Sequence, residues 1–111
     1  MLELLFGNEN IERVLFFLVA NDTCYGKQIA DRFSISVGYT QRSLEKLERA
    51  GILATQLVGR TRLYSFNPRY AFLDELKAFL SKAYSTLPIE MKEKYYEPII
   101  RQRPRRQGKP I

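Results

Sequence analysis

The sequence predicts a mainly helical fold with one small β-hairpin, an α+β architecture in a single domain. Apolar residues follow helical spacing through residues 11–50, the period changes to two over residues 54–66, and helical spacing returns from residue 70. The chain of 111 residues is 45% hydrophobic and 27% charged, which is the composition of an ordinary globular protein. This length is sufficient for one domain with a core of its own.

The first predicted helix begins after Asn8 or Asn10, since either side chain can cap it, and ends at Asn21-Asp22. Its core-facing positions have helical spacing: Ile11, Val14, Leu15 and Leu18. Phe16 and Phe17 lie off that stripe. Together with residues 4–6 they give this end of the chain more apolar surface than one small core needs.

Two short helices joined by a tight turn are predicted next. Tyr25, Ile29 and Phe33 mark the first of them, and residues 34–36 form the turn, with Ser36 capping the following helix. That helix runs from about Val37 to Ala50 and directs Thr40, Leu44 and Leu47 to the core, and Gly51 supplies a left-handed cap. Cys24, just before these helices, is interpreted as a small semi-buried residue, with a reactive thiol as the alternative.

After Leu53 the period of two predicts strands over 54–58 and 63–66, around the tip Gly59-Arg60-Thr61-Arg62. A fourth helix, about 70–86, has an apolar stripe too wide for a single contact. Pro88 and Pro98 bracket one further helix, about 89–96. We expect one domain over 1–100 and a disordered basic tail over 101–111.

The net charge of +6 is unevenly distributed. Residues 21–70 carry eight basic and four acidic side chains, and the tail carries five basic ones, whereas residues 1–20 and 71–100 are slightly acidic. The positive charge therefore coincides with the two short helices, the hairpin and the tail. This asymmetry suits a domain with one nucleic-acid face and other faces used for different contacts.

Two helices with a tight turn, followed by a hairpin with arginines at its tip, form a helix-turn-helix with a wing. The core-facing stripe would hold the third helix from behind, so that its other face can enter the DNA major groove. Polar side chains expected on that face are Ser36, Tyr39, Gln41, Arg42, Ser43 and Lys46. On the wing, Arg60, Thr61 and Arg62 would reach adjacent phosphate or a minor groove. The sequence thus predicts binding to double-stranded DNA.

The stretch SVGYTQRSLEKLERAGIL resembles the recognition helix of ArsR-like winged-helix regulators. The chain resembles more closely a prokaryotic winged-helix subgroup associated with nucleotidyltransferases. Three stretches carry this resemblance: LFG at residues 5–7, YGKQIADRF and GRTRLYSFNP. The resemblance covers about Leu5 to Leu80. It implies DNA contacts at Ser36, Tyr39, Gln41, Arg42, Arg60 and Arg62, and a dimer built from the first and last helices.

Two departures from these relatives are visible. Many ArsR-like sensors bind metal through Cys and His clusters, but this chain has one cysteine and no histidine, so no metal site and no cofactor are expected. The paired aspartates of a nucleotidyltransferase domain are absent, so the chain would be the DNA-binding half of such a system, with a nucleotidyltransferase-type protein as a possible partner. The dimer agrees with the surplus apolar surface, for which the candidate residues are Phe16, Phe17, Phe79, Leu80 and Tyr84.

The composition argues against other classes of function. Without histidine, a nucleophile elbow or a glycine-rich phosphate loop, no catalytic residues are expected and the chain is not predicted to be an enzyme. The longest apolar run, residues 14–20, is too short to span a bilayer, and a cytoplasmic location is expected. A winged-helix protein-interaction module that does not read DNA is the main alternative, although it would not need the basic charge of residues 21–70. RNA binding is a third alternative. It is disfavoured because the predicted fold has no sheet with aromatic side chains on which bases could stack.

Overall fold

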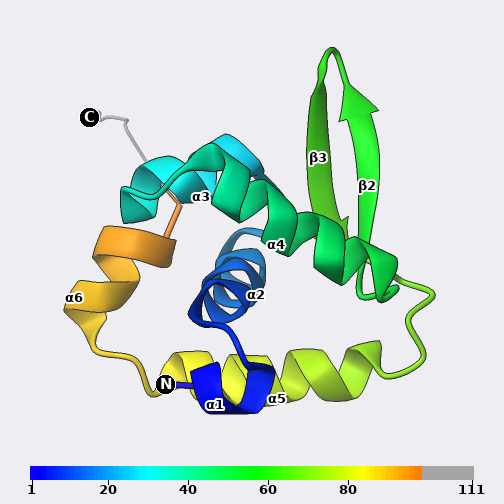
Figure 1. Cartoon of the computed structure of the whole chain (residues 1–111). Coiled ribbons are helices and arrows are strands. Elements are labelled where there is room, and N and C mark those ends of the chain that lie inside the picture. The colour runs from blue at the N-terminus through cyan, green and yellow to red at the C-terminus, as the bar shows by residue number, and fades with distance from the viewer. Residues whose placement is uncertain (99–111) are drawn as a thin grey trace, which may run out of the picture.

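The computed structural model describes residues 1–98, which form a helical body from which a β-hairpin projects (Figure 1). Helix α2 lies in the middle, with α4 on one side of it and α5 on the opposite side. The elements are α1 (Glu3–Phe6), α2 (Glu9–Asn21), β1 (Thr23–Tyr25), α3 (Gly26–Phe33), α4 (Val37–Arg49), β2 (Leu53–Val58), β3 (Thr61–Phe66), α5 (Leu73–Ser85), α6 (Ile89–Met91) and the π-helical turn η1 (Lys92–Tyr96). The basic tail and its predicted disorder lie outside the described residues.

Helix α2 begins where its cap predicts. The Oδ1 atom of Asn8 accepts hydrogen bonds from the backbone N–H groups of Asn10 and Ile11, at 2.7 and 3.3 Å. Two of the four otherwise unpaired N–H groups at this helix start are thereby satisfied. The predicted stripe of Ile11, Val14, Leu15 and Leu18 is buried, as expected from its spacing.

The expectation that Phe16 and Phe17 are left over for a partner is wrong for this protomer, because both are buried within it. The C-terminal elements cover this side of α2. Tyr84 of α5 and Tyr96 of η1 place their rings edge-on to Phe16, with centroids 5.9 and 5.7 Å away. Helix α2 is therefore surrounded on both sides, and its phenylalanines complete the core.

The helix-turn-helix consists of α3 and α4. Ser34 has a left-handed backbone, with φ of 55°, which turns the chain after α3, and the Ser36 Oγ atom accepts from the Tyr39 N–H at 3.0 Å to cap α4. After α4, Gly51 adopts φ of 82°, the left-handed conformation predicted for it. Thr40, Leu44 and Leu47 are buried, as the periodicity of this helix indicates.

The sheet has three strands in the order β1-β3-β2, all antiparallel. Strand β1, which the sequence analysis did not predict, places Cys24 opposite Tyr64 and joins the wing to the body. The hairpin turn is shorter than predicted, since β3 already begins at Thr61, which pairs with Val58. Only Gly59 and Arg60 form the turn, and Gly59 supplies the positive φ, 63°, that such a two-residue turn requires.

The C-terminal segment packs back onto α2 and α3. Helix α5 is slightly shorter than predicted, and the last predicted helix is divided into α6 and the π-helical turn η1. The Arg32 guanidinium donates to the carbonyl oxygens of Lys94, Glu93 and Glu97, at 3.1, 3.4 and 3.0 Å. Asn21 Nδ2 donates to the Tyr96 carbonyl at 2.6 Å. These bonds satisfy carbonyls at the end of the helical segment, which would otherwise lack partners.

No helix in the described part of the chain is both long and apolar enough to cross a bilayer.

Candidate nucleic-acid interface

Helix α4 has one face in the core and one in solvent. Thr40, Leu44 and Leu47 hold it against α2 and α3, while Arg42 and Lys46 are exposed on the other side. Ser36 is exposed at the start of the helix, and Tyr39 is half-buried in its first turn. The exposed part of α4 thus presents hydroxyl, guanidinium and ammonium groups, which are donors that reach base edges or phosphates.

Ser43, predicted to be exposed on the same face, is buried. Its Oγ atom accepts a hydrogen bond from Asn10 Nδ2 at 3.0 Å and donates to the Tyr39 carbonyl at 3.4 Å. Position 43 follows Thr40 by three residues and so lies on the same side of the helix, where α2 crosses it. Ser43 is therefore part of the helix–helix contact and does not face the solvent side of α4.

Gln41 is also less exposed than predicted. It is half-buried, and its Nε2 donates to the hydroxyl of Tyr64 at 2.8 Å. Tyr64 is fully buried at the base of the wing, and this burial, with Glu48 nearby, raises the pKa of its hydroxyl. The hydroxyl consequently stays protonated and neutral, and it accepts a hydrogen bond from α4.

The wing carries its basic residues at and near the tip. Arg60 lies in the turn, and Thr61 and Arg62 are exposed on the first residues of β3. Since side chains alternate along a strand, Arg62 is on the same face as Tyr64, and it lines a cleft with Glu45, Glu48 and Arg49 of α4. Arg62 therefore lies on the side of the wing that faces α4. Arg60 lies in the turn between β2 and β3, the end of the hairpin that projects from the body (Figure 1).

The charge on this side of the molecule is mainly positive. Exposed or partly exposed charged residues on α4 and the wing are Arg42, Glu45, Lys46, Glu48, Arg49, Arg60 and Arg62. The ion pairs found among the described residues involve none of these seven, so these basic groups are not neutralised at short range. A surface with an excess of unpaired cations attracts polyanions.

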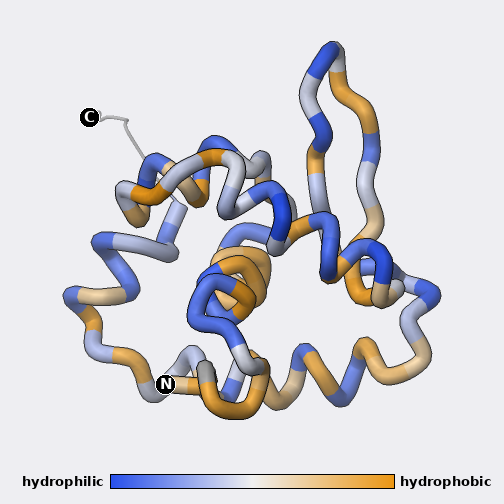
Figure 2. Tube along the Cα trace, in the orientation of Figure 1, coloured by the Kyte–Doolittle hydropathy of each residue, from blue (hydrophilic) through white to orange (hydrophobic). Residues whose placement is uncertain are grey.

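A different surface lies on the opposite side of α2. Helices α1 and α5 line an apolar groove there, with Leu5, Phe72 and Phe79 exposed at 66%, 64% and 44% of their surfaces. Figure 2 shows the hydrophobic residues of α1 and α5 at this edge of the molecule. Of the five residues predicted for dimerisation, Phe79 belongs to this groove, Tyr84 is half-buried beside Phe16, and Phe16, Phe17 and Leu80 are buried in the core.

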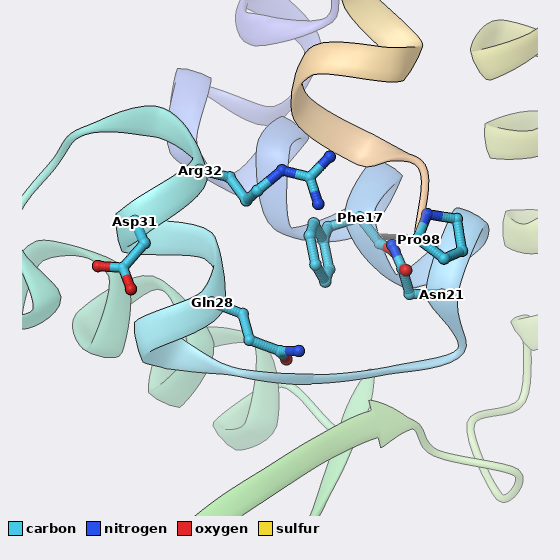
Figure 3. Close-up of a pocket in the computed structure, with 6 residues that line it drawn as sticks. All are labelled: Phe17, Asn21, Gln28, Asp31, Arg32 and Pro98. Atoms are coloured by element: carbon cyan, nitrogen blue, oxygen red, sulfur yellow. The ribbon is translucent and has the colours of Figure 1, made fainter. Parts of the chain in front are cut away.

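A further pocket lies between α2, α3 and the end of η1 (Figure 3). Its polar side chains already have partners within the protein: Arg32 and Asn21 hold the C-terminal carbonyls, Gln28 accepts from the Tyr25 N–H at 2.7 Å, and Asp31 pairs with Lys27. Arg32 and Asn21 thus join α3 and α2 to the C-terminal segment, whereas Gln28 and Asp31 make local bonds within α3 and its cap.

Cys24 is the one cysteine of the chain. It is fully buried in β1, and burial raises the pKa of its thiol to about 12. A thiol that stays protonated is a poor nucleophile and a poor metal ligand. Cys24 is thus a core residue, more deeply buried than the sequence analysis predicted.

No protein-family model matches the chain, and no curated protein matches it in sequence. Among solved structures, the chain is similar to Lactococcus lactis ZitR, in the apo form of a variant in which one cysteine and one histidine are replaced by alanine. The TM-score is 0.52 at 17% identity, and the match covers 83% of this chain and 78% of that chain. This likeness, together with the order of the elements, confirms the predicted fold: a winged helix-turn-helix with additional C-terminal helices.

Proposed function

We propose that this chain binds double-stranded DNA sequence-specifically and acts as a dimeric transcriptional regulator. The observation that carries the proposal is the arrangement of α4. Thr40, Leu44 and Leu47 fix its inner face, and Arg42 and Lys46 are exposed and unpaired on its outer face. A helix about 10–12 Å across fits the major groove, which is about 12 Å wide.

The exposed residues divide into two roles in this proposal. Arg42 and Tyr39 lie in the N-terminal half of α4, the part of a recognition helix that contacts base edges, and an arginine can donate two hydrogen bonds to guanine. Ser36, Lys46, Arg60, Thr61 and Arg62 lie around this centre and contact phosphates. Phosphate contacts fix the register of the protein on the duplex, and base contacts supply the sequence preference.

The groove between α1 and α5 is the proposed dimer interface. Leu5, Phe72 and Phe79 expose there a contiguous apolar surface, a feature that is typical of protein interfaces. A symmetric dimer through this groove would carry one copy of α4 in each subunit, and its operator would be a palindrome with half-sites about one helical turn, or a multiple of it, apart. The candidate residues of the groove replace Phe16, Phe17 and Leu80, which the protomer itself buries.

The same groove is the observation that favours the alternative, a winged-helix protein-interaction module. Such a module would use the apolar surface for a different protein, such as a nucleotidyltransferase-type partner, and would leave α4 in solvent. The two functions differ in what they require of Arg42, Lys46, Arg60 and Arg62. Only DNA binding depends on these four cations.

Selection from a pool of random duplexes, followed by fluorescence anisotropy on the enriched sequence, tests the proposal. We expect one enriched palindromic motif and a preference of about 10³-fold or more over random DNA at physiological salt. Lys82, an exposed lysine of α5, provides the control, since Lys82→Ala should leave binding unchanged. If no motif is enriched, and the quadruple replacement of Arg42, Lys46, Arg60 and Arg62 by glutamine has no effect on any duplex, the interaction module is supported instead.

A further inference from the structure

Gln41 lies at the junction of three elements. It belongs to α4, its Nε2 donates to the Tyr64 hydroxyl of β3 at 2.8 Å, and its Oε1 lies against Gly26, the first residue of α3. The Tyr64 side chain is fully buried, so this end of the hydrogen bond cannot move freely. The amide of Gln41 thus joins the recognition helix to the base of the wing.

Gly26 leaves the space that this side chain occupies. A Cβ atom at position 26 would lie 2.8 Å from Gln41 Oε1 and 3.4 Å from Leu44 Cδ1. The first distance is shorter than a van der Waals contact, so any larger residue would displace the Gln41 amide. Gly26 has no left-handed φ, and no turn requires a glycine here. The space it gives Gln41 accounts for a glycine at this position.

We propose that Gln41 is a positioning residue, which fixes the angle between the recognition helix and the wing and does not read a base. The inference rests on the proposed function, DNA binding through α4 and the wing. It also changes the role expected for Gln41, because its Nε2 is directed at the buried Tyr64 hydroxyl and its Oε1 lies against Gly26. Both atoms with which glutamine reads adenine therefore lie at this junction.

A small rotation at Tyr64 has a large effect at the tip of the wing. Arg60 precedes Tyr64 by four residues, a distance of about 13 Å in an extended chain. A tilt of about 10° at the base would move the Arg60 side chain by roughly 2 Å at this distance, which is enough to break a phosphate hydrogen bond. The Gln41–Tyr64 bond would therefore determine whether α4 and the wing contact the duplex at the same time.

Three single variants break this junction from different sides. Gln41→Met keeps the length of the side chain and removes the donor, and Tyr64→Phe keeps the buried ring and removes the acceptor. Gly26→Ala displaces the amide without changing either partner, and it favours the α3 helix by replacing a glycine. Gln56→Met on the exposed face of β2 and Tyr95→Phe in η1 are the matched controls, since neither residue contacts the junction.

The first measurement uses the free full-length protein. Residual dipolar couplings of the amides in α4 and in the β2–β3 hairpin should fit a single alignment tensor in the wild type and in both controls. In the three junction variants the hairpin should require a separate, smaller tensor, because only its pairing with β1 then restrains its orientation. A single tensor in all three junction variants would show that pairing with β1 alone fixes the hairpin, and it would overturn the proposal whatever the protein does with DNA.

The second measurement is affinity for the selected duplex. Gln41→Met, Tyr64→Phe and the double variant should each bind about fivefold more weakly, the factor expected for one neutral hydrogen bond, with no change in base preference. Changed preference at one base pair in Gln41→Met, with Tyr64→Phe unaffected, would show that Gln41 reads a base and would contradict the proposal. If the wild type binds no duplex while the couplings change as expected, the positioning role stands and DNA binding does not.

Discussion

The Nδ2 atom of Asn10 donates a hydrogen bond to the Oγ atom of Ser43 at 3.0 Å, and both side chains are buried. This contact joins α2 to α4 across the core. The hydroxyl of Ser43 in turn donates to the Tyr39 carbonyl one helical turn earlier. Helix α4 is thus held by a polar contact beside the buried side chains of Thr40 and Leu44 on the same helix.

We predict that Ser43→Ala lowers the free energy of unfolding by about 1–3 kcal/mol, because it leaves the buried amide of Asn10 without its acceptor. Urea denaturation would measure the change. Ser81→Ala, an exposed serine of α5, is the control and should be neutral or slightly stabilising. If Ser43→Ala left the stability unchanged but altered the base preference, Ser43 would contact DNA and the prediction would be wrong.

Arg42→Ala should weaken binding to the selected operator by about 1–3 kcal/mol and relax the preference at one base pair. The reason is that Arg42 is exposed in the N-terminal half of α4, where a guanidinium can pair with a base edge. Anisotropy titrations on the operator and on single-base variants of it would measure both effects. An equal loss on every sequence would assign Arg42 to phosphate.

Replacing Arg60 and Arg62 by glutamine should weaken binding to operator and random duplex alike. If each arginine neutralises one phosphate, the slope of log affinity against log salt should become shallower by about 1.8, since each phosphate contributes about 0.9. A salt series with both kinds of duplex provides the measurement, with Lys82→Gln as control. A loss confined to the operator would mean that the wing reads sequence.

Phe79→Glu should convert the protein to a monomer, because it places a charge in the apolar groove between α1 and α5. Sedimentation equilibrium at micromolar concentration would show the change. Leu57→Glu is the control, since Leu57 is also an exposed apolar residue, at 67% against 44% for Phe79, but lies on the wing. A wild-type protein that is monomeric both alone and on DNA would exclude the dimer.

Cys24 should react with iodoacetamide only when the protein unfolds. Burial raises its pKa from 9.0 to about 12, so at pH 8 the folded thiol contains about a thousandfold less thiolate than the unfolded one. Between these two values the unfolded state releases a proton that the folded state keeps, so stability should fall as the pH rises above 9. Mass spectrometry of alkylation with and without urea would measure the reactivity, and rapid labelling of the native protein would contradict the prediction.

The fold could be predicted where local spacing determines it. The inner stripe of α4 (Thr40, Leu44 and Leu47) and the caps at Asn8 and Gly51 follow from residues within one or two turns. Strand β1 could not be predicted in the same way, because three residues are too few to establish a period of two. Its β-branched and aromatic ends, Thr23 and Tyr25, were the available signal.

The site was harder to predict because polarity alone does not show which side of a helix a residue occupies. Ser43 and Gln41 have side chains suited to DNA, but the core uses both of them. The burial of Phe16 depends on Tyr96, far away in the sequence. Such long-range contacts have no signature in the local sequence pattern. That pattern therefore assigns the apolar residues Phe16 and Phe17 to a dimer interface.

The hydrogen bonds from Arg32 and Asn21 to the carbonyls of η1 and Glu97 have a consequence for the order in which the protein folds during synthesis. Asn21 and Tyr96 are 75 positions apart, so α2 is synthesised long before the residues that cover it. Until Tyr96 emerges from the ribosome, Phe16 lacks one of the two tyrosine rings that cover it, and a chain stopped after residue 86 should show this by binding a hydrophobic dye. The helix-turn-helix and the wing are therefore synthesised before the last helical turn that completes the core around α2.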